Sequence, residues 1–281
     1  MSETWDDGSR PPDHSVGLFG WPLVVLRGVP VVVTLLIGLI LTLVLRPIER
    51  IAAGEGRPVT PTITRVVCRL CLASMGIKLR LRGTPMKGAG AVVANHSSWL
   101  DILVLNAPKR IYFVSKAEVR DWPGIGWLAR VTGTVFIARN RREAGAQVEL
   151  FRSRLALGHR LLFFPEGTST DSKRVLPFKT TLFAAFFEPA LRETMRIQPV
   201  SVVYHAPTGR DARFFGWWGD MDLGPHLAAV LAARPQGWVE LVYHDPVQVA
   251  DFANRKMLAA HLETAVRGPL LSALGTDAPR P

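Results

Sequence analysis

The longest hydrophobic run of the chain lies near its N-terminus. Residues 28–45 carry no charged side chain and are bracketed by Arg27 and Arg46. As a helix rising ~1.5 Å per residue, this run spans roughly 27 Å, close to the ~30 Å hydrocarbon core of a bilayer. The pattern therefore predicts a membrane-associated helical segment over residues 16–77, preceded by a polar, disordered tail at residues 1–15.

The same pattern fits two alternatives to a single spanning helix. Residues 18–26 are also apolar, so a re-entrant hairpin with bends at Pro22 and Pro30 competes with it, as does a buried helix of a soluble domain. Further on, residues 61–77 combine apolar positions with two arginines and predict an amphipathic basic helix. Such a helix suits either a membrane interface or core packing.

The charges that flank the apolar run predict its orientation. Five arginines follow the run: Arg46, Arg50, Arg57, Arg65 and Arg69. On its N-terminal side, Arg10 and Arg27 are mixed with Glu3, Asp6, Asp7 and Asp13. By the positive-inside rule, we expect the rest of the chain to lie on the cytoplasmic face of the inner membrane.

From residue 78 onward, short apolar runs alternate with helical stretches. The predicted strands are residues 78–82, 90–94, 111–114, 134–137, 160–164, 197–203 and 239–243. The predicted helices are residues 98–105, 141–157, 180–191 and 251–274, the last broken near Pro269. This alternation predicts an α/β domain over residues 78–275, with a mostly parallel central sheet covered by helices and a loose tail at residues 276–281.

The charge balance limits the classes of partner. The chain has 34 Lys and Arg against 23 Asp and Glu, a formal net charge of +11, which suits an anionic membrane surface or an acidic protein. No zinc-finger spacing or aromatic-rich RNA-binding signature is present, which argues against nucleic acid. Cys68 and Cys71 form a lone C-x-x-C in a helical stretch, which we interpret as packing; we predict no metal site and no cofactor.

One candidate for chemistry follows the apolar run at residues 91–94. Asn95 and His96 leave this predicted strand directly, and Asp101 comes five positions after His96, beyond a predicted helix cap at Ser98. A carboxylate bonded to one imidazole nitrogen leaves the other free to take a proton from a hydroxyl. The spacing fits a capping box equally well, in which Asp101 serves only a backbone N–H.

Two further segments end predicted strands with polar residues. Glu166, Gly167 and Thr168 form a turn after the run at residues 160–164, where Glu166 could hold a polar group of a substrate or pair with a basic neighbour. Arg139 ends the strand at residues 134–137, where a guanidinium suits a phosphate or a carboxylate.

Taken in order, these segments resemble the glycerolipid acyltransferase family, whose best-known members are the 1-acylglycerol-3-phosphate acyltransferases. Four family motifs are matched: Asn-His-x4-Asp by Asn95, His96 and Asp101; Gly before Phe-Ile-x-Arg by Gly133, Phe136, Ile137 and Arg139; Phe-Pro-Glu-Gly-Thr by residues 164–168; and an apolar strand with Pro-Val by Ile197, Pro199 and Val200. The resemblance covers residues 78–204, nearly half of the chain.

The resemblance implies acyl transfer without a covalent enzyme intermediate. His96, oriented by Asp101, would deprotonate the hydroxyl of a lyso-lipid at the bilayer, and this hydroxyl would attack the thioester of acyl-CoA or an acyl carrier protein. The implied substrate-binding residues are Asn95, Lys116, Gly133, Arg139, Glu166, Gly167, Thr168 and Lys179.

One departure from the family pattern bears on the acceptor. Many phosphatidate-forming members carry Arg directly after Glu-Gly-Thr, where this chain has Ser169. We expect 1-acylglycerol-3-phosphate as the acceptor, with Arg139, Lys116 or Lys179 compensating, and keep a lyso-ornithine lipid as the alternative. Two hypotheses of other classes are a non-catalytic lipid-binding protein, against which the intact His96 and Asp101 argue, and a thioesterase.

Overall fold

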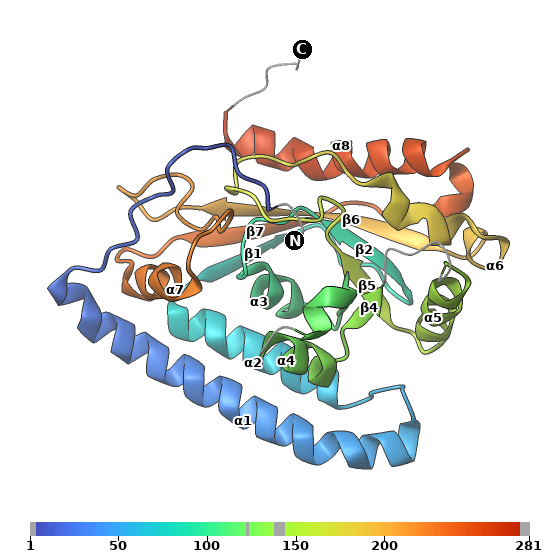
Figure 1. Ribbon diagram of the computed structural model, residues 1–281, viewed down its shortest axis with the longest axis horizontal. Helices are drawn as coiled ribbons and strands as arrows, with labels where there is room; N and C mark the ends of the chain where they lie inside the picture. The colour runs from blue at the N-terminus through green and yellow to red at the C-terminus, as the bar shows by residue number, and fades with distance from the viewer. Residues whose placement is uncertain (1–3, 122–123, 138–143, 276–281) are drawn as a thin grey trace.

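The computed structural model describes residues 4–121, 124–137 and 144–275, and its centre is a twisted sheet (Figure 1). Within these residues the strand order is β1-β7-β6-β2-β5-β3-β4, with β8 paired to β6. The strands are β1 (Lys78–Arg82), β2 (Gly90–Ala94), β3 (Tyr112–Lys116), β4 (Val135–Ile137), β5 (Arg160–Phe163), β6 (Arg196–His205), β7 (Trp238–Tyr243) and β8 (Val247–Gln248). Among the described strands, only the pairings of β6 with β7 and β8 are antiparallel, so the predicted mostly parallel sheet is confirmed.

Helices cover both faces of this sheet. They are α1 (Trp21–Ala53), α2 (Thr60–Met75), α3 (Asp101–Asn106), α4 (Ile125–Thr132), α5 (Ala144–Ala156), α6 (Pro189–Arg192), α7 (Leu223–Ala232) and α8 (Arg255–Ala273). The 3-10 turns are Leu18–Gly20, Ala117–Asp121, Thr180–Phe187 and Val249–Asp251.

Each face of the sheet has its own hydrophobic core. On β2, Val92 and Ala94 pack on the side of α2, α3 and α7, whereas Ala91 and Val93 pack on the side of α8 and the 3-10 turn at Thr180–Phe187. A strand buried on both faces is apolar at every position, which is why residues 90–94 form a continuous apolar run. The two cores fix β2, and with it the loop that follows Ala94.

Several predicted elements have different bounds in the structure. The helix expected at residues 180–191 is a 3-10 turn followed by α6, because Glu188 is extended in front of Pro189. The helix expected at residues 251–274 begins later, at Arg255, where the side chain of Asn254 caps it. The expected break near Pro269 is wrong: α8 continues through this residue, and Val266 and Leu270 on either side of it are buried against the sheet.

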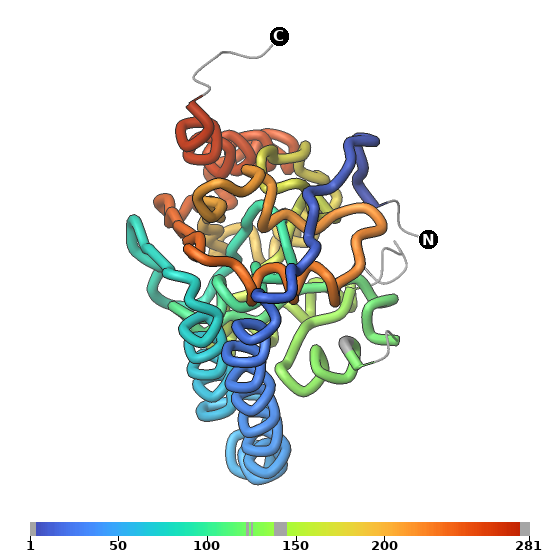
Figure 2. The backbone as a smooth tube through the Cα atoms, turned by 90° about the vertical axis from the view of Figure 1, so that its left-hand side faces the viewer, coloured from blue at the N-terminus to red at the C-terminus, as the bar shows by residue number. Residues whose placement is uncertain are grey.

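The N-terminal hydrophobic segment is one continuous helix. Helix α1 runs through Pro30 and Pro47, so the alternative of a re-entrant hairpin is wrong. It lies beside α2 on one side of the molecule (Figure 2), and it also contacts α7. Each proline removes one backbone hydrogen bond from the helix, and packing against α2 and α7 offsets this loss.

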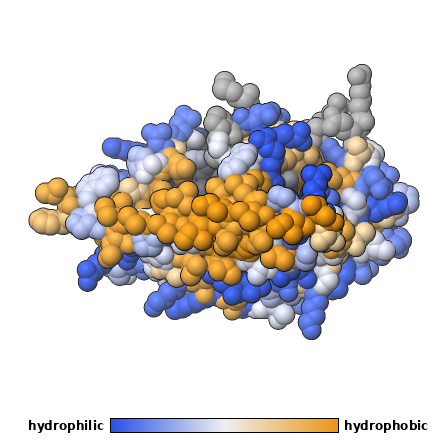
Figure 3. Space-filling view, turned by 90° about the horizontal axis from the view of Figure 1, so that it is seen from below, coloured by the Kyte–Doolittle hydropathy of each residue, from blue (hydrophilic) through white to orange (hydrophobic). Residues whose placement is uncertain are grey.

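Most of the α1 surface is apolar and exposed. The helical stretch from Leu18 to Ala53 is long and apolar enough to cross a membrane, and only 17% of its most apolar window is buried. Seen from below, an orange hydrophobic band crosses the molecule (Figure 3). The exposed apolar side chains of α1 include Leu26, Val33, Leu36, Ile40 and Val44. This helix therefore indicates association with a membrane and is not the core helix of a soluble domain.

The N-terminal segment before α1 lies against the α/β body. We expected residues 1–15 to be disordered, but the described part of this segment makes specific contacts. The backbone N–H of Trp5 donates a hydrogen bond to Thr168 Oγ1, and the Asp7 carboxylate pairs with Arg174 at 2.9 Å. Further along, His14 Nε2 lies 3.3 Å from the carbonyl oxygen of Phe214. The predicted tail at residues 276–281 lies outside the described residues.

Candidate active site

The site begins where β2 ends, at the carboxyl edge of the parallel strands. Asn95 is buried, and its side-chain amide bonds both backbone groups of Val202 on β6: Nδ2 donates to the carbonyl and Oδ1 accepts from the N–H. The side chain thereby extends the pairing of β2 with β6 by one more step beyond Ala94. Because these two hydrogen bonds hold Asn95 against β6, they fix the start of the loop that carries His96.

Asp101 is the polar centre of this loop. Its carboxylate is fully buried, and Oδ2 accepts hydrogen bonds from His96 Nδ1 at 2.7 Å and from the backbone N–H groups of Ser97 and Ser98. Asp101 thus both bonds the imidazole and satisfies the backbone of the turn. One oxygen atom makes both kinds of contact, so Asp101 does not serve a backbone N–H alone.

The second oxygen of Asp101 has a partner from another strand. Tyr204, at the end of β6, donates its hydroxyl to Asp101 Oδ1 at 2.7 Å. Burial and the neighbouring carboxylate raise the pKa of Tyr204 well above its ordinary value, so this hydroxyl keeps its proton. Sequence analysis missed Tyr204; the signal was a tyrosine in a fully buried strand, whose hydroxyl needs a partner.

Helix α3 starts one turn later than expected. We predicted a helix from Ser98 with Asp101 at the end of its first turn, but Asp101 is the first residue of α3, and residues 99–100 form a turn. Ser98 does not cap it, because Ser98 Oγ is buried without a hydrogen-bond partner among the described residues. The carboxylate of Asp101 instead accepts from the N–H of Ser98, in the turn before the helix.

The His96 ring is held between this network and an aromatic face. It stacks on Phe164 with centroids 4.1 Å apart and 11° between the planes, and its side chain is 25% exposed. Because Asp101 is an acceptor for Nδ1, the neutral ring carries its proton there. Nε2 has no hydrogen bond within the described part of the chain and is therefore free to accept a proton.

Glu166 supports the loop from behind. Its side chain is buried, Oε1 accepts from the backbone N–H of His96 and Oε2 accepts from that of Leu176, both at 2.6 Å. Burial raises the pKa of Glu166 to about 8, against the effect of these two donors. Both oxygens are thus committed to the backbone, and the carboxyl group braces His96 and does not face an open space.

The rest of the Phe-Pro-Glu-Gly-Thr turn lies close to His96. Gly167 has φ +76°, a conformation that favours glycine, and Lys179 Nζ lies over it, 2.8 Å from where a Cβ would be. Thr168 accepts the hydrogen bond from Trp5, and the N–H of Thr170 donates to the carbonyl of His96. The structure therefore brings Lys179 and Thr168 to the same turn.

Three other predicted site residues are placed differently. Lys116 ends β3, at the same edge of the sheet as His96. Gly133 follows the last residue of α4 with φ +88°, where its N–H caps the helix, and a Cβ here would lie 2.9 Å from the guanidinium of Arg57. Arg139 lies outside the described residues.

Carboxylates neutralise the arginine that follows the Phe-Pro-Glu-Gly-Thr turn. Ser169 is buried and uncharged, so this position supplies no cation. The nearby Arg174 guanidinium bonds both oxygens of Asp171 and also Asp7 from the N-terminal segment. Two carboxylates therefore compete with any anionic ligand for this arginine.

The described residues contain no group of three or more metal-ligating side chains. Cys68 and Cys71 are free and buried on α2, in the core beneath the sheet. A buried aspartate, a histidine with a free Nε2 and an edge of parallel strands open to a ligand make a site for proton abstraction from a hydroxyl. Fold and site together define the class of an acyltransferase.

Comparison with known proteins identifies the family. A family model described as "Acyltransferase" matches residues 78–203. The lyso-ornithine lipid O-acyltransferase of Rhodobacter capsulatus is 56% identical over 94% of this chain and 95% of the relative, and that of Brucella abortus is 39% identical over 75% and 80%. The chain therefore belongs to the acyltransferase family that its motifs resemble, and it is an enzyme of the lysophospholipid acyltransferase type.

More distant comparisons agree with this assignment. The 1-acyl-sn-glycerol-3-phosphate acyltransferase of Neisseria gonorrhoeae is 35% identical over 50% of this chain and 54% of the relative. The crystal structure of the 1-acyl-sn-glycerophosphate acyltransferase PlsC from Thermotoga maritima aligns with a TM-score of 0.62 over 94% of this chain and 97% of that chain, at 21% identity. That similarity confirms the predicted fold.

Proposed function

We propose that this protein transfers a fatty acyl group from an acyl thioester to the hydroxyl of a lyso-ornithine lipid. The observation that carries this proposal is the extent of the similarity. The relative named for this acceptor matches almost the whole chain, whereas the Neisseria relative named for acylglycerol phosphate matches half of it. The proposal replaces 1-acylglycerol-3-phosphate, our first expectation, with the alternative.

The charges of the acceptor turn support the same choice. A glycerol phosphate carries a phosphate group, whereas an ornithine head group carries an ammonium and a carboxylate. The phosphate would need a free guanidinium, but Ser169 stands where related enzymes have Arg, and Arg174 is paired with two carboxylates. Lys179 Nζ lies above Gly167, where it suits the carboxylate of an ornithine head group.

The chemical step follows from the contacts of His96. Nε2 takes the proton from the lipid hydroxyl while Nδ1–H donates to Asp101, whose charge stabilises the imidazolium that forms. The hydroxyl oxygen attacks the thioester carbonyl, the C–S bond breaks, and the thiol leaves with the proton returned by His96. The donor is acyl-CoA or an acyl carrier protein, and no cofactor takes part.

The position of the enzyme follows from α1. Its exposed apolar face would lie in the bilayer, and the arginines after it would keep the α/β body on the cytoplasmic face of the inner membrane. Both the lyso-lipid and the product reside in that bilayer, so an active site anchored there reaches them without removing them from the membrane.

Thiol release by the purified protein in detergent tests this function. We expect release from an acyl thioester to depend on added lyso-ornithine lipid and to be absent from His96→Ala. Release without any acceptor would indicate a thioesterase. Absence of release with either lyso-ornithine lipid or lysophosphatidic acid, from protein that is folded and binds the donor, would favour the lipid-binding hypothesis.

A further inference from the structure

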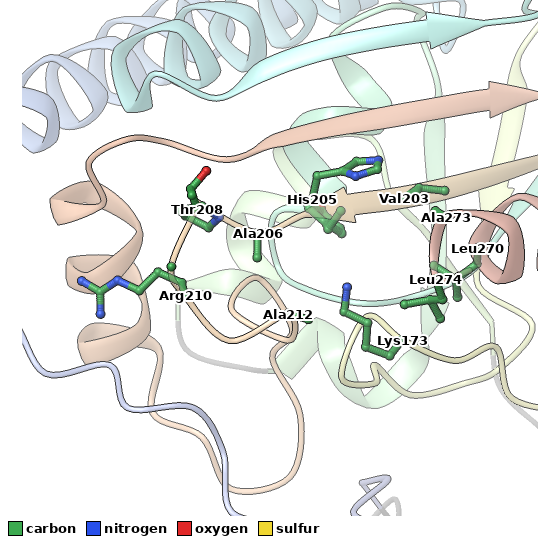
Figure 4. A pocket seen from close by; sticks show the side chains of 13 residues that line it. Lys173, Val203, His205, Ala206, Thr208, Arg210, Ala212, Leu270, Ala273 and Leu274 are labelled. Carbon is green, nitrogen blue, oxygen red and sulfur yellow. The ribbon is translucent and has the colours of Figure 1, made fainter. Parts of the chain in front are cut away.

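A tyrosine of β6 completes the hydrogen bonds of Asp101. Side chains alternate along this strand: Val202 and Tyr204 pack in the core on the side of α3, whereas Val203 packs in the core on the side of α8. Figure 4 shows the α8 side, where Val203 and His205 border a cavity of about 330 Å³. The side chain of Tyr204 therefore extends from the opposite face of β6, toward Asp101 at the start of α3.

The two oxygens of the Asp101 carboxylate have different partners. Oδ2 accepts from His96 Nδ1 and from two backbone N–H groups of the turn before α3. Oδ1 accepts from the hydroxyl of Tyr204 at 2.7 Å, and the described residues supply no other donor to it. Asp101 is 0% and Tyr204 2% exposed, so bulk water cannot take the place of this hydroxyl. The carboxylate that bonds His96 therefore depends on Tyr204 to satisfy its second oxygen.

The position of the Tyr204 hydroxyl is fixed before any substrate binds. Its ring packs on Phe215 with centroids 5.4 Å apart, and its backbone lies in the antiparallel pairing of β6 with β7. Two residues earlier on the same strand, Val202 bonds the side chain of Asn95 through both of its backbone groups. Strand β6 thus holds the loop after β2 at both of its ends, through an amide at the start and a carboxylate at the end.

Acyl transfer makes two opposite demands on His96. Nε2 must take the proton of the acceptor hydroxyl, and it must then release this proton to the leaving thiolate. A buried carboxylate with fewer donors would bind the imidazolium more tightly and oppose the second step, whereas donors that share its charge weaken it as an acceptor. Burial and the neighbouring Asp101 raise the pKa of Tyr204 well above its ordinary value, so its hydroxyl keeps its proton and shares this charge throughout the neutral range.

We propose that Tyr204 is a positioning residue of the acyl transfer: it holds the Asp101 carboxylate in place and limits how tightly the imidazole of His96 keeps a second proton. Because it is buried, Tyr204 reaches neither substrate and acts through Asp101. The inference rests on the proposed function, since it requires His96 to act as the base.

The pH dependence of the rate tests this role. In Tyr204→Phe, the carboxylate of Asp101 loses a donor and becomes a stronger acceptor, so His96 should stay protonated to higher pH. We expect the acid limb of the kcat/KM profile to move up by about 0.5–1 pH unit, which lowers the rate on the limb about three- to tenfold. On the plateau above the limb the rate should recover, and the KM values of both substrates should not change.

Tyr243→Phe is the matched control. It removes a hydroxyl from the neighbouring strand β7, where the side chain is also buried and its hydroxyl forms no hydrogen bond with the described residues. Its profile should match that of the wild type.

Other titrations do not account for a shift between the two profiles. Each of the other ionisable groups on the elements packed around the loop after β2 is the same in Tyr204→Phe and in the wild type. These groups are Glu166, Lys179 above the same turn, Arg267 of α8 and His226 of α7.

The outcomes separate this role from a structural one. An unchanged acid limb would overturn the proposal. So would an equal loss of rate at every pH, which would assign Tyr204 to packing alone, or a rise in the KM of either substrate, which would place it in contact with that substrate.

A spectroscopic measurement without substrates keeps the inference separate from the proposed function. The NMR resonance of the His96 Nδ1 proton moves downfield as its hydrogen bond to Asp101 strengthens. We expect a downfield shift in Tyr204→Phe and an upfield shift when a ring-fluorinated tyrosine, whose hydroxyl is a stronger donor, occupies position 204.

The fluorinated protein retains the hydrogen bond, so it gives an answer even where Tyr204→Phe does not fold. An unmoved resonance in the fluorinated protein, or shifts in the same direction in both proteins, would overturn the inference. Since the resting enzyme is measured, the result stands even where no lyso-lipid is turned over and the proposed function fails.

Discussion

The two motif loops at the edge of the sheet differ in what they present. In the loop of residues 95–101, the buried groups converge on Asp101, and His96 is left with a partly exposed ring and a free Nε2. In the loop of residues 164–170, the most polar side chain, Glu166, points inward and holds the first loop by its backbone. A charged residue in a motif therefore need not face the substrate.

The largest expected effect is on the first loop. His96→Ala removes the proposed base, and we expect acyl transfer to fall about 10²–10⁴-fold. The side chain is partly exposed and contacts Phe164 and Asp101, so thermal unfolding and membrane association should change little. Initial rates at saturating donor and acceptor measure the effect; a rate like that of the wild type would refute the mechanism.

Asp101→Asn separates the two roles of this carboxylate. If the carboxylate orients His96, its replacement should lower kcat at least about 10²-fold by leaving the imidazole in the wrong tautomer. If it were a cap alone, stability would fall by about 0.5–2 kcal/mol while kcat stayed intact. Ser98→Ala is the matched control, because Ser98 Oγ has no hydrogen-bond partner among the described residues, and it should alter neither quantity.

A substitution in the second loop should affect the stability of the protein more than its catalytic rate. In Glu166→Gln, one of the two backbone N–H donors, of His96 or Leu176, must face an amide NH2 group. We expect a loss of about 1–3 kcal/mol in the free energy of unfolding and a smaller decrease in kcat than in His96→Ala. Denaturant titration and steady-state kinetics give the two values. Loss of activity with unchanged stability would place Glu166 in contact with the substrate and break the comparison.

The smallest effect concerns the pH dependence of stability. Since the pKa of Glu166 is raised from 4.5 to about 8, the folded protein retains this proton between pH 5 and 8 while the unfolded chain releases it. Stability should therefore fall with rising pH in this window. In Glu166→Gln the contribution is absent, so the Tm of the variant should rise relative to that of the wild type from pH 5 to 8. A constant difference in Tm would show that Glu166 is ionised in the folded protein.

The sequence predicted the frame of the fold well because its signals are local. Strands buried on both faces read as apolar runs, and β1 and β2 have the predicted bounds. The predictions failed where packing over a long distance outweighs a local rule. Proline normally ends a helix, but α1 continues through Pro30 and α8 through Pro269, because buried residues near each proline pack against neighbouring elements.

In the site, too, the sequence predicted local contacts and missed contacts between distant residues. The spacing of His96 and Asp101 is local and was visible in the sequence. The hydroxyl of Tyr204 reaches Asp101 from 103 residues away, and Trp5 reaches Thr168 from 163 residues away. Contacts of this kind depend on the order of strands in the sheet and on the course of a polar segment, neither of which has a local signal.

Competition between two acceptors in one reaction tests the central claim most directly. Purified protein receives equal amounts of lyso-ornithine lipid and lysophosphatidic acid with one labelled acyl thioester, and the two products are separated. We predict almost exclusive labelling of ornithine lipid, and a shift toward phosphatidic acid in Asp7→Asn, which releases Arg174 from one of its two carboxylates. Predominant labelling of phosphatidic acid by the wild type would contradict the account and restore acylglycerol phosphate as the acceptor.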